Sequence, residues 1–487
     1  REGREAQNRL VLFGRATGSR HVVAEDHDFV SSPVFSPDGD RLAYLTWDHP
    51  RMPWQGTELR VCGLSGGEAQ GARRVAGGPS ESIFQPTFAP DGTLVFVSDR
   101  SGWWNLYALR GDEAHPLAPR AEEFGRPQWV FGMTTYAFSG DEIVCRVGVE
   151  GSSRLARLDP TAGTLEFIPL PFSEIDGLAV SGPEVWMVAA GAREARGVAV
   201  YNLEDRSLAR IRGGGAAGLA DDVIAVAEAR QFATAGEETA YGFFYAPVGD
   251  GVRGPEGESP PLLVRTHGGP TSASGAALDL SIQYFTTRGF AVFDVNYRGS
   301  TGYGRAYWEA LAGQWGIVDV EDCAAAATDA VARGLADPSR LAIRGGSAGG
   351  YTTLCALTFG DVFHAGASYY GIGDLELLAR DTHKFESHYT DWLVGPYPEA
   401  RALYRERSPL HFAESLRRPV IFFQGLRDRV VPPNQAETMV AALAAAGVDH
   451  EYVTFANEGH GFRDATSLVT ALERELGFYR RVFHLAG

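Results

Sequence analysis

The sequence predicts two domains, a β-propeller over residues 1–235 and a doubly wound α/β sheet over residues 236–487. Three observations support this division. A Pro-Asp-Gly turn recurs between short strands early in the chain, the composition changes after Ala233, and strands then alternate with helices to the end. A chain of 487 residues is also too long for a single hydrophobic core.

The repeats lie in the first domain. The segments 32–39 (SPVFSPDG) and 85–92 (QPTFAPDG) each precede a short apolar strand. In the Pro-Asp-Gly turn, proline presets φ and glycine adopts the positive φ, so each unit is expected to be strand, turn and strand. Weaker copies begin near Arg126, Ile175 and Ala217, which makes about five units of the kind that forms propeller blades. An irregular β-sandwich is the alternative.

The second domain alternates between strands and helices. We expect strands at 239–245, 262–266, 290–295, 341–345, 364–369, 419–423 and 451–455, and helices at about 275–288, 319–334, 348–358, 433–446 and 465–484. The strands are short and apolar, as in a parallel sheet that is buried on both faces. Residues 249–261 are rich in Gly, Pro and Glu and are expected to form a surface loop.

A G-x-S-x-G pattern occupies Gly345, Ser347 and Gly349, between the expected strand at 341–345 and the helix that follows it. This context is typical of a nucleophile elbow, in which a sharp turn exposes the serine hydroxyl at the edge of a sheet. Glycines on both sides leave room for the strand and the helix to pass close together. We therefore expect Ser347 to be a nucleophile; an ordinary strand-to-helix turn is the alternative.

A serine nucleophile needs a base, and the base needs an orienting carboxylate. Asp428 and His460 each follow a predicted strand, and they come after Ser347 in the chain order of such hydrolases. We expect His460 to accept the Ser347 proton and Asp428 to hold the imidazole tautomer. Taken singly, Asp428 could pair with a neighbouring arginine and His460 could be a solvated loop residue.

The strand at 262–266 ends in His267-Gly268-Gly269-Pro270. Glycine-rich loops at this position present backbone N–H groups to a developing oxyanion. We expect the N–H groups of Ala348 and Gly269 to form the oxyanion hole.

Composition restricts the partners. The net charge of −17 argues against nucleic acid and anionic membrane surfaces as binding partners. The four cysteines lie far apart and form no metal-binding spacing, so we expect reduced thiols in a cytoplasmic protein and neither a metal nor a cofactor. The sequence contains no apolar run long enough for a transmembrane helix.

Together these motifs resemble the prolyl oligopeptidase family of serine peptidases, in which a β-propeller precedes an α/β-hydrolase domain. The matching segments are His267–Pro270, Asn296–Gly304, the Ser347 elbow, Asp428–Pro432 and Gly459–Phe462. His267 and the run Trp103–Tyr107 are similar to the acylaminoacyl-peptidase branch. Other branches carry at the position of His267 a tyrosine that assists the oxyanion hole, so Gly269 is the expected donor here.

The resemblance also has implications for the chain as a whole. Propellers of this family usually have about seven blades, so about five units suggest missing N-terminal sequence, and a smaller propeller is the alternative. The family implies short peptide substrates, because its propeller excludes folded proteins. Membership also suggests a homo-oligomer, a dimer or larger.

Candidate substrate-binding residues follow from the same resemblance. Glu122 and Glu123 are candidates for a peptide amine, and Arg298 and Lys384 for a carboxylate or acyl group. Surface charge is the alternative for the two glutamates, and structural ion pairs for the two basic residues. The segment Asp381–Tyr389 is expected to line the pocket, with Phe385 and Tyr389 against a substrate side chain.

Three functions are compatible with the sequence. The first is a serine peptidase of the acylaminoacyl, dipeptidyl or oligopeptidase type that forms an acyl-enzyme on Ser347. The second is an esterase that uses the same three residues. The third is a non-catalytic propeller binding module, which the intact Ser, Asp and His set argues against.

Overall fold

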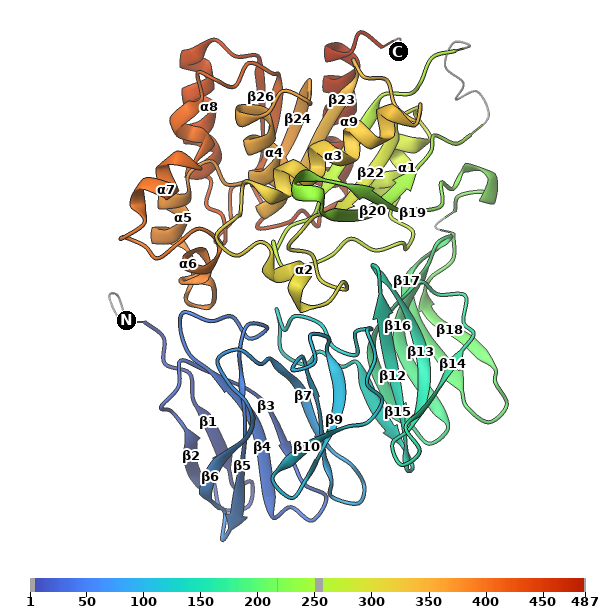
Figure 1. Cartoon of the computed structure of the whole chain (residues 1–487), viewed down its shortest axis with the longest axis vertical. Helices are drawn as coiled ribbons and strands as arrows, with labels where there is room; N and C mark the ends of the chain where they lie inside the picture. The colour runs from blue at the N-terminus through green and yellow to red at the C-terminus, as the bar shows by residue number, and fades with distance from the viewer. Residues whose placement is uncertain (1–4, 217, 250–256, 486–487) are drawn as a thin grey trace. The chain divides into compact units, whose positions relative to one another are not determined.

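The structure is a computed structural model that describes residues 5–216, 218–249 and 257–485. The chain divides into two compact units, Arg1–Gly215 with Thr301–Ala306, and Ala216–Ser300 with Tyr307–Gly487 (Figure 1). The boundary expected after residue 235 therefore falls inside the second unit. The reason is that β19 (Glu228–Ala233) already pairs with β20 (Thr239–Tyr245) in the sheet of the second unit.

The first unit is built from antiparallel sheets, in each of which neighbouring strands follow one another in the chain. Such four-stranded meanders are propeller blades, so this part of the predicted fold class is confirmed. A two-stranded sheet holds β1 (Leu10–Phe13) and β2 (Arg20–Ala24). The four-stranded sheets are β3 (Phe29–Phe35), β4 (Arg41–Trp47), β5 (Glu58–Ser65) and β6 (Glu68–Gly77); β7 (Ile83–Phe88), β8 (Leu94–Ser98), β9 (Asn105–Arg110) and β10 (Glu113–Pro116); β11 (Tyr136–Ser139), β12 (Glu142–Val149), β13 (Ser152–Asp159) and β14 (Thr164–Ile168); and β15 (Glu174–Ser181), β16 (Glu184–Gly191), β17 (Glu194–Asn202) and β18 (Leu208–Gly213).

The two Pro-Asp-Gly turns lie where the repeats predict them, between β3 and β4 and between β7 and β8. Gly39 and Gly92 adopt φ values of 77° and 84°, which favour glycine. The Asp38 carboxylate closes the first turn by accepting the Asp40 N–H at 3.1 Å.

The weaker repeats fare differently. The copy near Ile175 lies in β15, whereas the residues from Arg126 to Trp129 form a loop ahead of β11. The copy expected near Ala217 is wrong as a blade: Ala217 itself lies outside the described residues, and the next strand, β19, joins the sheet of the second unit. The additional strand pair of the first unit is instead the β1–β2 hairpin at its start.

The second unit contains an eight-stranded mixed sheet in the order β19-β20-β22-β21-β23-β24-β25-β26. Its parallel strands occur at or within one or two residues of the positions expected from the sequence. They are β21 (Leu262–Thr266), β22 (Ala291–Asn296), β23 (Leu341–Gly346), β24 (Ala365–Tyr369), β25 (Val420–Gly425) and β26 (His450–Phe455). β20 runs antiparallel to β22. The α/β part of the predicted fold class is thus confirmed.

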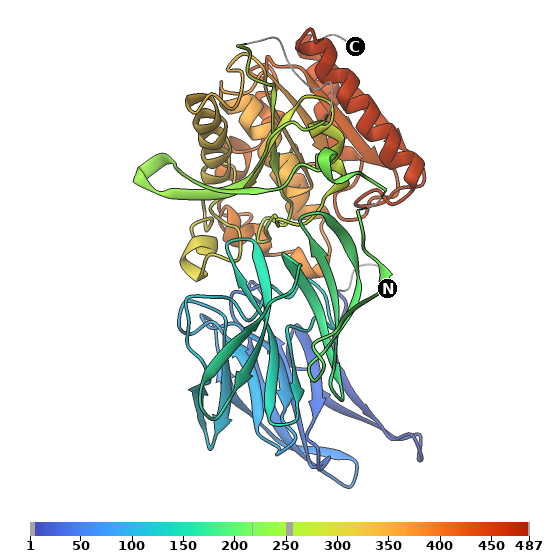
Figure 2. The same cartoon turned by 90° about the vertical axis from the view of Figure 1, so that its right-hand side faces the viewer.

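Helices cover both faces of this sheet, with α9 on one face and α3 and α4 on the other (Figure 2). The α-helices are α1 (Leu280–Thr286), α2 (Arg305–Glu309), α3 (Val318–Ala332), α4 (Ala348–Phe359), α5 (Leu375–Asp381), α6 (Tyr389–Leu393), α7 (Arg401–Glu406), α8 (Asn434–Ala446) and α9 (Ala465–Val482). α1 begins later than expected because Asp279 caps it, accepting the Ser281 N–H at 2.8 Å. Phe285 of α1 and Tyr479 of α9 pack with Val292 and Phe423 of the sheet in one buried cluster.

The parallel strands place the predicted functional residues at one edge of the sheet. His267 follows β21, Ser347 follows β23, Asp428 follows β25, and His460 follows β26. All four lie beyond the carboxyl ends of their strands, as the sequence analysis expected. Across the described residues, no helix combines the length and the apolar character needed to cross a membrane.

Candidate active site

Ser347 occupies a strained turn between β23 and α4. Its backbone has φ 55° and ψ −121°, outside the regions that non-glycine residues normally adopt. The turn is held on both sides: the Ser347 N–H donates to the Tyr369 carbonyl at 2.9 Å, and the Ser347 carbonyl accepts the Tyr351 N–H at 3.1 Å. This is the elbow geometry that the sequence pattern predicts.

The two glycines of the pattern are required by close backbone contacts. A Cβ on Gly345 would lie 2.4 Å from the carbonyl of Gly349, and a Cβ on Gly349 would lie 2.3 Å from the Thr266 carbonyl oxygen. Both obstacles are main-chain atoms, which cannot move aside as a side chain can. β21, β23 and α4 therefore meet at a distance that excludes any side chain at these two positions.

Asp428 and His460 lie in contact. His460 Nδ1 is 2.8 Å from Asp428 Oδ2, and Asp428 Oδ1 accepts the N–H groups of Val430 and Val431 at 2.9 Å each. The Asp428 side chain is fully buried, whereas 24% of the His460 side chain is exposed. With Nδ1–H donated to the carboxylate, Nε2 of the neutral ring is free to accept a proton.

Hydrogen bonds to Glu458 stabilise the loop that carries His460. Its carboxylate accepts the N–H of Arg463 at 3.0 Å and that of Asp464 at 2.9 Å. These two hydrogen bonds lower the pKa of Glu458, with the bond from Asp464 contributing most. The Glu458 carbonyl accepts the Arg427 N–H at 2.9 Å, which joins this loop to the loop that carries Asp428.

Tyr370 packs against the catalytic histidine candidate. Its ring lies 4.9 Å from that of His460 and 5.3 Å from that of Phe462, and it covers Gly346, where a Cβ would come within 3.0 Å of the tyrosine ring. Burial raises the pKa of Tyr370, so its phenol stays protonated. The sequence analysis missed this residue; the available signal was its position directly after a strand of the functional edge.

The predicted oxyanion donors lie on both sides of the elbow. Ala348 is the first residue of α4, so its N–H has no acceptor within the helix. Gly269 adopts φ 126°, and the preceding Gly268 lies so near the elbow that a Cβ there would be 3.5 Å from the Ser347 Cβ. The glycine-rich loop therefore passes beside the nucleophile candidate.

His267 holds this loop in place through hydrogen bonds and ring stacking. Its Nδ1 lies 2.8 Å from the Gly268 carbonyl, its Nε2 lies 2.7 Å from Ser300 Oγ, and its ring stacks on Tyr297 at 4.4 Å. Burial lowers the pKa of His267 to about 4, so the ring is neutral at neutral pH. The arrangement then has one consistent reading: Nδ1–H donates to the carbonyl and Nε2 accepts the Ser300 hydroxyl.

Arg298 and Tyr389, which were predicted to contact substrate, both contact other residues of this unit. The Arg298 guanidinium lies against α3, with Nη2 2.8 Å from Asp322 Oδ1 and 2.9 Å from Glu321 Oε2. This is the structural ion pair that the sequence analysis weighed as the alternative. The Tyr389 hydroxyl lies 2.5 Å from Thr271 Oγ1, next to the glycine-rich loop. Lys384 and Phe385 lie in the short 3-10 helix η3 (Lys384–Glu386).

The two glutamates of the first unit are also engaged. Glu122 bridges Arg120 and Arg154 at 2.6 and 3.0 Å. Glu123 is buried and accepts the N–H groups of Trp104 at 2.8 Å and Gly304 at 3.1 Å. Burial raises the pKa of Glu123 to about 7. Each carboxylate thus already has partners within its own unit.

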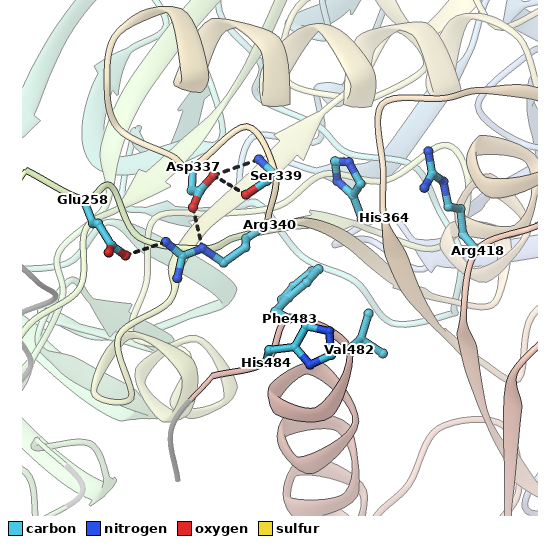
Figure 3. A pocket seen from close by; sticks show the side chains of 9 residues that line it. All are labelled: Glu258, Asp337, Ser339, Arg340, His364, Arg418, Val482, Phe483 and His484. Atoms are coloured by element: carbon cyan, nitrogen blue, oxygen red, sulfur yellow. Dashed lines mark hydrogen bonds and ion pairs between the residues drawn. The ribbon is translucent and has the colours of Figure 1, made fainter.

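Figure 3 shows the residues that line a pocket of about 640 Å³ at the start of β23 and β24. Ser347 follows the opposite end of β23. Asp337 accepts the Ser339 N–H at 2.8 Å and pairs with Arg340, which also reaches Glu258 at 2.8 Å (Figure 3). These contacts tie together the turn that leads into β23. A second pocket, of about 820 Å³, is lined by the His460 loop and adjoins the candidate site itself.

Within the described part of the chain, two groups of His and acidic side chains come close enough to share a metal ion: Glu5, Asp28 and His49, and Asp374, Glu376 and His411. In the second group, Asp374 caps α5 and Glu376 pairs with Arg401 at 2.5 Å. Neither group contains Ser347, Asp428 or His460, and we assign no metal to either.

The fold and the site together define an α/β-hydrolase with a serine elbow and an Asp–His pair, preceded by propeller blades. A model described as "Prolyl oligopeptidase family" matches residues 276–486. The crystal structure of puromycin hydrolase is 42% identical, with a TM-score of 0.93, over 97% of this chain and 72% of that one. The chain belongs to the prolyl oligopeptidase family, which confirms the resemblance seen in the sequence.

Curated relatives match mainly the second unit. The dipeptidyl aminopeptidase BIII of Pseudoxanthomonas mexicana is 34% identical over 208 residues, 42% of this chain and 30% of the relative. The acylamino-acid-releasing enzyme of Arabidopsis thaliana is 33% identical over 215 residues, 42% of this chain and 28% of the relative. The matched part of the chain thus covers less than a third of the length of either enzyme.

Proposed function

We propose that this protein is a serine peptidase that hydrolyses short peptides through an acyl-enzyme on Ser347. The observation that carries the proposal is the 2.8 Å contact between His460 Nδ1 and the buried Asp428 carboxylate, at the same sheet edge as the strained Ser347 elbow. An Asp that fixes the tautomer of a partly exposed His is the arrangement that turns a serine hydroxyl into a nucleophile.

In the proposed mechanism, Ser347 Oγ attacks the scissile carbonyl while His460 Nε2 takes the hydroxyl proton. Asp428 stabilises the resulting imidazolium, and the N–H groups of Ala348 and Gly269 stabilise the oxyanion. The C–N bond then breaks as His460 passes the proton to the leaving amine. Water, activated by the same histidine, hydrolyses the ester and restores Ser347.

The names of the relatives indicate which end of a peptide substrate is cleaved. A dipeptidyl aminopeptidase, an acylamino-acid-releasing enzyme and a puromycin hydrolase are all among the matches. We propose that this chain acts as an exopeptidase near the amino end of short peptides. The first two names differ in whether the terminal amine is free or acylated, and this choice can be decided experimentally.

The test is a matched substrate panel with wild-type protein and the Ser347→Ala variant. The panel contains free-amine and N-acetylated aminoacyl p-nitroanilides, a free-amine dipeptidyl p-nitroanilide and p-nitrophenyl acetate. Anilide cleavage that disappears in the variant is the expected result. Activity that survives the substitution would reject Ser347 as the nucleophile, and hydrolysis of the ester alone would favour an esterase.

We also propose a cytoplasmic location and a homo-oligomeric assembly. All four cysteines are unpaired and buried, which suits a reducing compartment. The oligomer is an expectation from the family alone. Fractionation of the native host and analytical ultracentrifugation of the purified protein test the two statements, and an extracellular or a monomeric protein would contradict them.

A further inference from the structure

Tyr389, three residues after Glu386, lies beside the glycine-rich loop of the candidate active site. The Tyr389 hydroxyl accepts the Thr271 N–H at 3.3 Å and lies 2.5 Å from Thr271 Oγ1. Thr271 follows the His267–Pro270 loop directly. This pair of contacts fixes the segment that contains Glu386 against the loop expected to hold the oxyanion.

Glu386 differs from the other carboxylates near this edge in having almost no partner. Its oxygens accept no hydrogen bond from any residue in the described ranges, and its one ionic contact is His383 Nε2 at 3.7 Å. Asp428, by contrast, accepts three hydrogen bonds, and Glu376 pairs with Arg401. The Glu386 side chain is 24% exposed, so its carboxylate is partly buried and still open to an incoming group.

The surroundings of Glu386 affect the pKa of its carboxyl group. Burial raises the pKa of Glu386, and the charges of His383 and His460 oppose that rise. Glu386 lies three residues before Tyr389, whose hydroxyl contacts Thr271 next to the glycine-rich loop. An ionised carboxylate accepts hydrogen bonds, and it binds a cationic nitrogen more strongly than a neutral donor.

We propose that Glu386 is an anionic subsite that binds a cationic nitrogen of the substrate. The nitrogen is either the free α-ammonium or the side chain of a Lys or Arg residue next to the scissile bond. This inference rests on the proposed peptidase function. The proposed specificity is for peptides whose amine is unblocked or whose adjacent side chain is basic.

The test compares Glu386→Gln with Glu399→Gln, which removes the same charge from an exposed position. Substrates are the p-nitroanilides of Ala, acetyl-Ala and acetyl-Lys, together with p-nitrophenyl acetate. We expect Glu386→Gln to lower kcat/KM by about 10- to 100-fold for the cationic substrates, mainly through KM, and to leave the neutral ones within about twofold. Loss confined to Ala p-nitroanilide identifies the α-ammonium, and loss confined to acetyl-Lys identifies the side chain.

Equal losses on cationic and neutral substrates would overturn the proposal, because Glu386 would then act on His460 and not on the substrate. An unchanged selectivity would overturn it as well. Glu386→Asp, which keeps the charge, should restore part of the preference, and thermal unfolding shows whether each variant is folded.

A binding measurement separates this inference from the proposed function. In the Ser347→Ala background, calorimetry compares Ala-Gly-Gly, acetyl-Ala-Gly-Gly and acetyl-Lys-Gly-Gly with and without Glu386→Gln. We expect the cationic peptide that binds to lose about 10- to 100-fold in affinity, whatever the catalytic outcome. If the wild-type protein is inactive but Glu386→Gln still weakens binding of the cationic peptide, the peptidase function is rejected and the subsite is kept. If the wild-type protein is active but Glu386→Gln does not weaken binding, the subsite is rejected and the peptidase function is kept.

Discussion

Tyr370 presents its ring to the imidazole of His460, with the ring centroids 4.9 Å apart and the planes at 61°. The tyrosine follows β24, which lies in the sheet between the strands that carry Ser347 and Asp428. It therefore forms part of the wall that keeps His460 in place opposite the carboxylate of Asp428.

We predict that Tyr370→Ala lowers kcat by about 10- to 100-fold, because the imidazole loses a packing partner and gains freedom to turn. Tyr370→Phe keeps the ring and should retain activity within about threefold. Steady-state kinetics on p-nitrophenyl acetate, which does not test peptide recognition, provides the measurement. Equal losses in both variants would show that the hydroxyl, and not the ring, matters.

His267 should make stability depend on pH. Its folded pKa of about 4 lies below the ordinary value of 6.5, so the unfolded chain binds more protons between these two pH values. Stability is therefore expected to fall as the pH drops from about 6.5 to about 4, by at most about 3 kcal/mol from this residue. Urea unfolding at several pH values, compared between wild type and His267→Gln, isolates the effect. Parallel pH curves for the two proteins would contradict it.

The ion pair between Arg344 and Glu475 lies in the core behind the active site. The two groups are 3.3 Å apart, and Glu475 also accepts the hydroxyls of Tyr369 at 2.5 Å and Tyr479 at 3.0 Å. Glu475→Leu leaves the buried guanidinium without its partner and should cost about 3 to 5 kcal/mol in the free energy of unfolding. The double variant Arg344→Met/Glu475→Leu should recover much of that loss. Guanidinium-chloride unfolding measures both, and a double variant less stable than the single one would contradict the argument.

Two glycines with opposite surroundings provide a matched pair. Gly349→Ala would place a Cβ 2.3 Å from the Thr266 carbonyl oxygen, whereas the same substitution at Gly477 in α9 meets nothing within 4 Å. We expect Gly349→Ala to abolish activity or folding, and Gly477→Ala to raise stability by about 0.5 to 1 kcal/mol. Thermal unfolding and ester hydrolysis measure the two effects. A Gly349→Ala protein with normal activity would show that the elbow has more room than the structure gives it.

Local patterns in the sequence predict the strands of the second unit and the chain positions of Ser347, Asp428 and His460. These features depend on apolar runs and on the rule that parallel strands end at one edge. The fifth unit expected near Ala217 is wrong as a blade, because a short strand pattern in the sequence does not show which other strand it pairs with. β19 pairs with β20 and not with a blade, and only the tertiary structure decides this.

Residues whose roles come from neighbours distant in sequence were harder to find. Glu386 lies in the segment 381–389, which the sequence analysis singled out, yet its lack of partners becomes visible only once the contacts are known. Arg298 shows the converse, because Glu321 and Asp322 are more than twenty residues away in the chain and pair with it through the packing of α3. A sequence lists charges but not which of them neutralise one another.

The segment Thr301–Ala306 belongs to the first unit although the chain on both sides of it belongs to the second. Its Arg305 pairs with the buried Asp99, and its Gly304 N–H donates to Glu123. No single cut in the chain can therefore release the hydrolase intact. A fragment that starts at Ala216 contains the segment Thr301–Ala306 but lacks the residues of the first unit that bind this segment. For anyone engineering this scaffold, the propeller is a part to be redesigned together with that loop and not a module to be exchanged.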